Sequence, residues 1–237
     1  MADVKGRSAT GDPTGDPTGD PTGDPTGDPT GDRVDGRRER SRRTRRAIVR
    51  AATDLFVDRG YGATTIAQIA DAAGVAAPTV YASYGTKVAI LSAALDQAIA
   101  GDDEEVVVNA RDWMAPVWTA PSAAERLAAY AAACRRMMLG AGDIFAVVTA
   151  AASTDAELAD LAATTEQRRR LGATAVVDSV LEVGALRDGL DRDDAVDVLW
   201  LLNSPVVFTH LVRGAGWSPD RYERWLAGAF ERELLGG

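Results

Sequence analysis

Apolar side chains recur at helical spacing along most of the chain. Between Thr44 and Arg59 they fall at i, i+3, i+4, i+7 and i+8, a spacing that places them on one face of an α-helix. These residues are Ile48, Ala51, Ala52, Leu55 and Phe56. The pattern predicts a helix from Thr44 to Arg59 that Gly60 ends, because glycine readily takes the left-handed conformation found after a helix.

Two short helices are predicted between Thr65 and Tyr84. Thr65 followed three residues later by Gln68 forms a capping box, so we expect a helix to begin there and to end at Gly74. Pro78 fits the first turn of the next helix, where its missing N–H costs nothing. A tight turn between two short helices is typical of a helix-turn-helix, although an ordinary helical hairpin shows the same spacing. The small core predicted for the three helices is Ile48, Leu55, Phe56, Ile69, Val75, Val80 and Tyr84.

The rest of the pattern also predicts helices, so the fold class is all-α. Thr86 can cap a fourth helix that begins with Lys87 and links two domains. A connecting loop with Trp113, Pro116, Trp118 and Pro121 comes next. Further helices are predicted from about Ser122, over Asp143 to Ala152, Asp155 to Gly172, Ala173 to Val183 and Asp193 to Val212 with a kink at Pro205, and after Ser218. The predicted divisions are a tail and basic arm over 1–40, the helix-turn-helix domain over 41–90, and a larger helical domain over 91–237.

Residues 11–30 are five consecutive copies of Gly-Asp-Pro-Thr. The repeat has no apolar residue and a proline in every copy, so it cannot bury enough surface to fold, and we expect disorder. It could act as an acidic competitor for the neighbouring arginines, or it could be a tolerated expansion without a role. The composition favours the second interpretation.

The charge of the chain changes sign after the repeat. Residues 33–91 carry a net charge of +6, whereas residues 92–237 carry −10 within a chain of net charge −9. A charged run is often only a solvated segment, but a basic run beside a helix-turn-helix in an acidic protein favours binding to phosphates. The arginines of this arm are Arg33, Arg37, Arg38, Arg40, Arg42, Arg43, Arg45, Arg46 and Arg50.

Composition argues against an enzyme. The chain has one histidine and one cysteine, and it contains neither a glycine-rich phosphate loop nor a Gly-x-Ser-x-Gly motif. The acidic run from Asp102 to Glu105 suits a helix N-terminus better than a divalent cation, and His210 and Cys134 fit as packed residues. We predict no catalytic residue, metal or cofactor, although a hydrolase built on carboxylates alone stays open. Without an apolar leader or a membrane span, we expect a cytoplasmic protein.

The helix-turn-helix region resembles the DNA-binding domain of the tetracycline-repressor (TetR) family of bacterial regulators. The resemblance runs from about Arg45 to Leu95 and rests on Gly60-Tyr61, Thr64-Thr65, Ile69-Ala70, Ala73-Gly74-Val75, Thr79-Val80-Tyr81, Tyr84 and Lys87. It implies phosphate contacts at Thr65, Thr79, Tyr81 and Lys87 and an approach to base edges at Ala77 and Pro78. Arg45, Arg46, Ser83 and Tyr84 complete the predicted DNA-contact set. Two positions depart from the family: Ala76 replaces a serine, and Ser83 replaces a histidine.

The resemblance also implies a ligand cavity and a four-helix dimer interface in the C-terminal domain. The candidate ligand residues are Trp113, Trp118, Tyr130, Met137, Met138 and Phe145, and the candidate interface residues are Trp200, Phe208, Tyr222, Trp225 and Phe230. The sequence is therefore interpreted as a homodimeric transcriptional regulator that binds a palindromic double-stranded DNA operator and is released by a small, mostly apolar molecule. The alternative is a helical binding protein with a helix-turn-helix-like hairpin but no operator specificity.

Overall fold

The structure is a computed structural model, and it describes residues 29–102, 104 and 106–236. Helix is the only regular secondary structure within these residues, so the predicted all-α class is confirmed. Residues 11–28 of the Gly-Asp-Pro-Thr repeat, predicted to be disordered, lie outside the described residues. The prediction is wrong for the last two residues of the repeat, Pro29 and Thr30, which begin a helix. By compactness the chain divides into residues 1–38 and a second unit, Glu39–Gly237.

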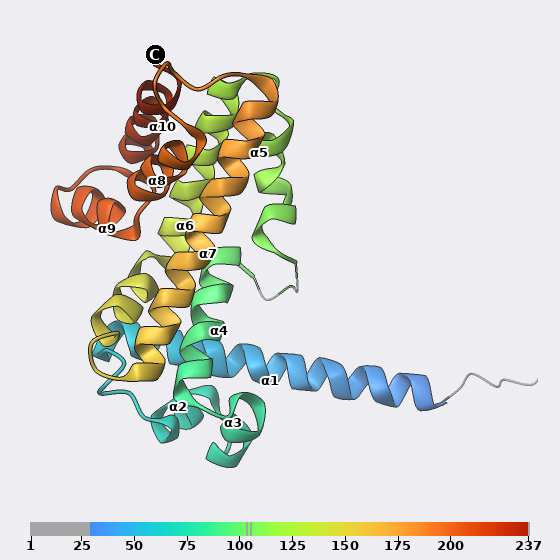
Figure 1. The fold of residues 1–237 in the computed structure, drawn as a ribbon. Coiled ribbons are helices and arrows are strands. Elements are labelled where there is room, and N and C mark those ends of the chain that lie inside the picture. Colours follow the sequence, from blue (N-terminus) through green and yellow to red (C-terminus); the bar gives the residue numbers. More distant parts are fainter. Residues whose placement is uncertain (1–28, 103, 105, 237) are drawn as a thin grey trace, which may run out of the picture. The chain divides into compact units, whose positions relative to one another are not determined.

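The elements follow one another without a sheet (Figure 1). They are α1 (Pro29–Arg59), α2 (Ile66–Ala73), α3 (Ala77–Tyr84), α4 (Lys87–Ala100), the 3₁₀ turns η1 (Val108–Ala110) and η2 (Asp112–Met114), α5 (Ala115–Thr119), α6 (Ala123–Ala151), α7 (Ala156–Val183), α8 (Arg192–Leu202), α9 (Pro205–Phe208), the π-helical segment η3 (Thr209–Gly214) and α10 (Pro219–Leu235).

Helix α1 begins at Pro29, well before the predicted start at Thr44. Proline at a first helical position loses no hydrogen bond, and the arginines that follow lose little rotamer freedom in a helix. The apolar stripe on which the prediction relied begins only at Ile48, so the basic arm gave no periodic signal. The arm is helical from Pro29 onward.

Local capping signals placed α2 correctly. The Thr65 side chain accepts a hydrogen bond from the Gln68 amide, and the Gln68 side chain accepts one from the Thr65 amide, which completes the predicted capping box. Gly74 ends the helix with a φ of 67°, a conformation that glycine adopts without the steric cost of a Cβ atom. The amide of Val75 donates to the carbonyl of Ala70 at 3.0 Å, which closes the turn before α3.

The predicted core of the helix-turn-helix is largely confirmed. Ile48, Phe56, Ile69 and Val80 are each at most 1% exposed. Leu55, Val75 and Tyr84 are half-buried at the edge of the same cluster. Helix α4 contributes its own buried stripe to this cluster and also contacts α6 and α7. The buried residues of that stripe are Ile90, Leu91, Ala94, Leu95 and Ala100.

Helices α6 and α7 are continuous where the sequence predicted breaks near Asp143 and Gly172. Glycines inside α6 explain the error, because they serve packing rather than termination. A Cβ atom on Gly140 would lie 2.6 Å from the carbonyl oxygen of Ala98 in α4, and one on Gly142 would lie 3.4 Å from the ring of Phe208. Gly140 thus allows α6 and α4 to approach backbone to backbone.

Gly140→Ala is expected to destabilise the fold by about 2 kcal/mol, because the new methyl group must push α4 and α6 apart. Gly172→Ala in α7 is the matched control, since nothing lies within 4 Å of its Cβ position. The control should gain about 0.5–1 kcal/mol from better helix propensity. Urea unfolding of both variants measures the difference. Equal stabilities for the two variants would mean that α4 and α6 are not in close contact.

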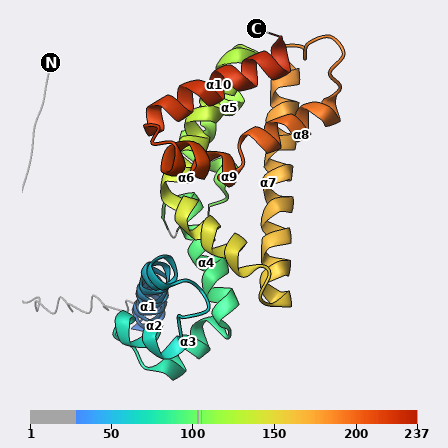
Figure 2. The same cartoon turned by 90° about the vertical axis from the view of Figure 1, so that its left-hand side faces the viewer.

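The segment from Arg192 to Gly214 is the most apolar part of the described chain. Its mean hydropathy reaches 1.5, so its length and composition would allow it to cross a membrane. One segment of this kind is weak evidence of a membrane span, because a core helix can have the same length and composition. It is not one helix: α8 ends at Leu202 and α9 begins at Pro205. Proline cannot continue an interior hydrogen-bond ladder, so the predicted kink at Pro205 is a break. Figure 2 shows this segment and α10 gathered against α6 and α7.

Three of the predicted interface residues are wrong. Phe208, Tyr222 and Phe230 are each at most 1% exposed within the single chain, so they cannot meet a partner. The Phe208 ring lies edge-on to Tyr222 with centroids 5.0 Å apart, and the Phe230 ring stacks on Tyr130 at 5.8 Å. The apolar stripe of α10 packs on α6 of its own chain. Trp200 and Trp225 are half-buried.

The acidic run after α4 is also placed differently from the prediction. No described helix begins at Asp102; instead, the guanidinium of Arg111, which is 8% exposed, donates to the Asp102 carboxylate at 2.6 Å and to the Glu104 carbonyl at 3.1 Å. The hydrogen bond from Arg111 lowers the pKa of Asp102. The two acids therefore balance a buried arginine rather than a helix dipole.

Candidate nucleic-acid interface

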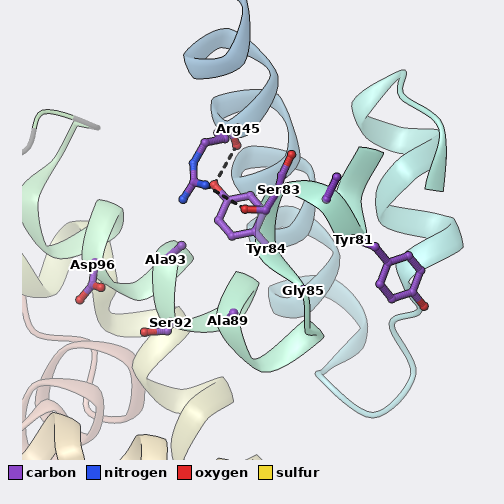
Figure 3. A pocket seen from close by; sticks show the side chains of 10 residues that line it. Arg45, Tyr81, Ser83, Tyr84, Gly85, Ala89, Ser92, Ala93 and Asp96 are labelled. Carbon is purple, nitrogen blue, oxygen red and sulfur yellow. Dashed lines mark hydrogen bonds between the residues drawn. The ribbon is translucent and has the colours of Figure 1, made fainter. Parts of the chain in front are cut away.

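Helix α3 presents an exposed surface made of Pro78, Thr79 and Tyr81, called the α3 surface below. The Tyr81 side chain is 56% exposed, which is unusual for a large aromatic residue. Figure 3 shows it pointing away from the residues that join α3 to α1 and α4. Ala77 is half-buried beside this surface. Short side chains around one exposed tyrosine let a helix approach a flat or grooved partner closely.

A junction made of Arg45, Ser83 and Tyr84 ties α1 to the end of α3. The Arg45 guanidinium donates to the Ser83 carbonyl at 2.8 Å and lies 4.4 Å above the Tyr84 ring, while the Tyr84 hydroxyl donates to the Arg45 carbonyl at 3.3 Å. Burial raises the pKa of Tyr84, and the Arg45 charge partly opposes that rise. The Ser83 hydroxyl donates to the Thr79 carbonyl within α3. Three of the predicted contact residues thus also hold the domain together.

An open hollow of about 510 Å³ lies beside this junction, as Figure 3 shows. Arg45, Tyr84 and Gly85 line one part of it, and Ala89 and Asp96 of α4 line another. The hollow therefore marks where α1, α3 and the first turns of α4 meet.

The start of α3 has no side-chain cap. Ala76 occupies the cap position with φ −75° and ψ 144°, which is the extended conformation that a capping residue needs, but a methyl group cannot accept a hydrogen bond. The first amides of α3 therefore receive no help from residue 76. Of the two helices of the helix-turn-helix, α2 has a side-chain cap at its start and α3 does not.

Ala76→Ser is expected to raise the free energy of unfolding by about 1 kcal/mol, because the backbone is already in the capping conformation and the hydroxyl can accept from an α3 amide. The matched control is Ala82→Ser, an exposed interior position of the same helix, where serine should cost a few tenths of a kcal/mol. Thermal unfolding distinguishes them. A serine at 76 that stabilises no more than one at 82 would show that α3 does not begin at Ala77.

Thr65 and Lys87 lie at the starts of α2 and α4. Thr65 is exposed, and its hydroxyl oxygen is occupied by the Gln68 amide, which leaves the hydroxyl hydrogen to donate outward. The Lys87 ammonium donates to the Tyr61 and Thr64 carbonyls at 2.8 and 2.7 Å and lies 4.0 Å from the centre of the Tyr61 ring. Burial lowers the pKa of Lys87. Two of the three N–H donors of this ammonium are therefore engaged within the chain.

Helix α1 carries a dense set of exposed basic side chains on the approach to the helix-turn-helix. They are Arg37, Arg38, Arg40, Arg42, Arg43, Arg45, Arg46 and Arg50. Spaced at one to four residues, they wrap around the helix, and a helical segment fixes their spacing more than an extended arm would. Arg45 and Arg46, which were predicted as contact residues, belong to this set.

The six candidate ligand residues do not form one compact site. Tyr130, Met138 and Phe145 are buried along α6, and Met137 is half-buried beside them. The rise from Tyr130 to Phe145 along a helix is about 22 Å, too far for one small molecule to touch both ends. The remaining two, Trp113 and Trp118, are half-buried in η2 and α5, where Trp118 donates its indole N–H to the Asn109 carbonyl.

A buried polar cluster that the sequence analysis missed lies between α6, α7, α8 and α10. Asn203 donates to the Tyr130 hydroxyl at 2.6 Å and accepts from Arg169 at 2.6 Å, and Arg169 also donates to the Trp200 carbonyl. Burial raises the pKa of the Cys134 thiol to about 12 and the pKa of Tyr222 well above its ordinary value. The Tyr222 hydroxyl has no hydrogen-bond partner among the residues that the structure describes. An asparagine inside an apolar run was the signal that could have indicated this cluster.

Comparison with known proteins decides the family. Residues 48–94 match the family described as bacterial regulatory proteins, tetR family. Residues 48–94 form a DNA-binding domain of the TetR family. The matched residues are those of α1 to α4 that carry the resemblance seen in the sequence, from about Arg45 to Leu95.

Several transcriptional regulators are similar to the chain over most of its length. It is 26% identical over 173 residues to the uncharacterized HTH-type transcriptional regulator YdeS of Bacillus subtilis, which covers 72% of this chain and 80% of that protein. A putative TetR-family regulator from Rhodococcus sp. shares the fold at a TM-score of 0.62, with 18% identity over 81% of this chain and 98% of that one. A putative transcriptional regulator from Saccharomonospora viridis in complex with choline matches at 0.60, with 21% identity over 81% and 97%.

A third solved structure is NalD of Pseudomonas aeruginosa, described as the secondary repressor of the MexAB-OprM multidrug efflux pump. It matches at a TM-score of 0.60 with 20% identity over 82% of this chain and 98% of that one. TetR-family proteins are transcriptional regulators, so the chain is a DNA-binding regulator by family. Among the described residues no group of three or more histidine, cysteine or acidic side chains could hold a metal ion.

Proposed function

We propose that this TetR-family regulator is a homodimeric, cytoplasmic repressor that binds a palindromic operator and is released by a small, mostly apolar molecule. The α3 surface carries the proposal. Pro78, Thr79 and Tyr81 are exposed on a short helix that is packed and tied on its other sides, so they are free to meet the edges of base pairs.

The proposed contacts combine base readout with phosphate binding. Ala77 and Pro78 approach base edges in the major groove, where small side chains allow the helix to enter deeply. Thr65, Thr79, Tyr81 and the arginines of α1 meet phosphates, which explains why the net charge of +6 over residues 33–91 stands in an acidic chain. Ser83, Tyr84 and Arg45 contribute chiefly by holding α3 against α1.

The proposed dimer interface uses the apolar side chains that the single chain leaves exposed. Leu201 on α8 is 63% exposed and Val206 on α9 is 51% exposed, while Val198 and Trp200 on α8 and Trp225 on α10 are half-buried. A two-fold dimer presents its two α3 surfaces symmetrically, so it selects a palindromic site with half-sites about 34–36 Å apart. Leu201→Glu should produce monomers in sedimentation equilibrium. An intact dimer for that variant would place the interface elsewhere.

The proposed effector site lies among the C-terminal helices. Two observations support this. First, α4 contacts both α6 and α7, so a ligand that moves these helices would also move the helix that leads to the DNA-binding domain. Second, a solved structure of similar fold is described as a complex with choline. The candidates are still Tyr130, Met137, Met138, Phe145, Trp113 and Trp118, but a single small molecule would contact only some of them, because Tyr130 and Phe145 lie about 22 Å apart along α6. An effector that lowers DNA affinity must itself be bound more weakly by the DNA complex, by the same factor.

A mobility-shift assay with DNA flanking the protein's own gene tests the proposal. The expected result is a complex that an excess of random-sequence duplex does not remove. The double variant Thr79→Ala, Tyr81→Ala should lose the preference for the flanking DNA while keeping the weaker binding to random duplex. Equal affinities of the wild-type protein for flanking and random DNA would favour the alternative, a helical binding protein without operator specificity. Derepression of a flanking promoter on deletion of the gene tests the sign of regulation.

A further inference from the structure

We propose that Arg169 is a positioning residue that holds the break between α8 and α9 in the geometry that dimerisation requires. The inference rests on the proposed function, because it takes the exposed side chains of Leu201 and Val206 to meet a partner subunit. Its structural part, that Arg169 fixes the break, is a property of the single chain. That part can be tested in a monomeric variant.

The break changes the hydrogen bonds at the end of α8. In a continuous α-helix the Ser204 amide would donate to the Trp200 carbonyl, four residues earlier. It donates instead to the Leu201 carbonyl at 3.1 Å, and Pro205, which follows, has no N–H to donate. The Trp200 carbonyl is thus one of the acceptors that a helix end leaves for a donor outside its own backbone.

Arg169 of α7 supplies that donor and also holds the residue at the break. Its guanidinium donates to the Trp200 carbonyl at 3.0 Å and to the side-chain oxygen of Asn203 at 2.6 Å. The Arg169 side chain is 12% exposed, and the more exposed carboxylate of Glu166 pairs with its charge. One planar group therefore joins the last turn of α8 to the first residue beyond that helix.

Asn203 is held from a second direction as well. It is 6% exposed, and its side-chain amide donates to the Tyr130 hydroxyl of α6 at 2.6 Å. Its oxygen is engaged by α7 and its nitrogen by α6, so the residue between α8 and α9 cannot move outward without breaking a buried hydrogen bond. The break is therefore a fixed corner rather than a flexible hinge, and Arg169 is its contact with α7.

This corner determines how two exposed apolar side chains are presented. Leu201 lies two residues before Asn203 and Val206 three residues after it, and the two are 63% and 51% exposed. Their relative direction depends on the backbone of Asn203, which has φ −84° and ψ 12°. A partner has to meet both side chains at once, and a surface that is ordered before association binds more tightly. Without Arg169 the corner would have to be ordered during dimerisation.

The first experiment measures the dimer dissociation constant of Arg169→Met by sedimentation equilibrium. The substitution removes both hydrogen bonds to the break, and we expect the dissociation constant to rise about 30-fold. Arg170→Met is the matched control, because it removes the neighbouring α7–α8 pair with Asp197 and leaves the break intact. It should change the constant less than about threefold. A wild-type dissociation constant for Arg169→Met overturns the proposal.

Two further comparisons separate positioning from a general loss of stability. Ile144→Val removes a buried methylene group from α6 away from the break, so it should lower stability and leave the dissociation constant within about threefold. At the break itself, Asn203→Asp keeps an acceptor for Arg169 and can accept from the Tyr130 hydroxyl, so it should dimerise like the wild type. Asn203→Leu, similar in shape, should weaken the dimer as Arg169→Met does. Equal dimerisation of the two Asn203 variants, or a dimer that weakens in step with stability, overturns the proposal.

The last experiment tests the corner without a dimer. In the Leu201→Glu background, Arg169→Met should accelerate hydrogen exchange of the Asn203 and Ser204 amides about tenfold or more, while amides in the middle of α6 keep their exchange rates. Unchanged exchange at the break overturns the proposal. A dimer that survives Leu201→Glu would instead refute the proposed interface, and the exchange rates in that protein would still decide whether Arg169 fixes the break.

Discussion

Raising the pH from 9 to 11 is expected to remove about 5 kcal/mol of stability, enough to unfold many proteins of this size. Three groups in the buried cluster of the C-terminal helices are neutral acids that alkali can deprotonate, and burial raises the pKa of each: Cys134 from 9.0 to about 12, and both Tyr130 and Tyr222 above 10.0. Their neutral, protonated forms suit the folded interior. The unfolded chain loses these protons at ordinary pKa values, so alkali favours it.

The sign and size follow from proton linkage. Stability from these groups is complete below pH 9, and it falls by about 1.4 kcal/mol per pH unit for Cys134 above that point and for each tyrosine above pH 10. Urea unfolding at half-unit steps of pH measures the loss. A constant free energy of unfolding between pH 9 and 11 would mean that these side chains reach water in the folded protein.

Two phenylalanine substitutions separate the tyrosines. Tyr222→Phe should change stability little at pH 8, because its hydroxyl has no partner, and should recover about 1.4 kcal/mol at pH 11. Tyr130→Phe should cost about 1 kcal/mol at pH 8, because it removes the acceptor of the Asn203 amide. Equal losses at pH 8 for both variants would contradict this assignment of hydrogen bonds.

Replacing Arg37, Arg38 and Arg43 together with glutamine is expected to weaken binding to random duplex DNA roughly 100-fold at 50 mM salt. These arginines are exposed on α1, and each cation that meets a phosphate releases about 0.9 counterion. The salt slope should therefore flatten by about 2.7 units. Fluorescence anisotropy with a labelled duplex over 50–200 mM salt gives both quantities.

The matched control makes the same change of charge elsewhere. Arg170, Arg192 and Arg213 are about half-exposed on the C-terminal helices, and each pairs with an aspartate of its own chain. Their replacement with glutamine should leave the slope within about 0.5 unit, and exposed pairs of this kind add little stability. If the two triple variants weaken DNA binding alike, net charge rather than the α1 arginines determines affinity.

The helix-turn-helix was predictable because its signals are local. Thr65, Gln68, Gly74 and Pro78 each determine the backbone within four residues, so the sequence placed α2 and α3 correctly. The start of α1 was missed because its first turns have no apolar stripe. The hydrogen-bond partners of Lys87 were not predicted because they are 23 and 26 residues away in the sequence. Distant partners leave no periodic trace in a sequence.

The C-terminal helices show the limit more clearly. The sequence predicted a new helix from Asp143, yet α6 continues through this point, and Gly140 just before it allows contact with Ala98, more than 40 residues earlier. The stripe that contains Phe208, Tyr222 and Phe230 has the right spacing for either a partner chain or a neighbouring helix. Only the packing of α10 on α6 decides between them. Periodicity reports that a face is covered, and it does not report which element covers it.

The uncapped start of α3 also bears on how this regulator can change under selection. Every alanine codon becomes a serine codon by one base substitution, so about 1 kcal/mol of extra stability lies a single mutation away at Ala76. Substitutions at the neighbouring Ala77, Thr79 or Tyr81, the residues proposed to meet DNA, will often destabilise the domain by a similar amount. A lineage that first acquires serine at position 76 can therefore tolerate substitutions in α3 that would unfold the present protein.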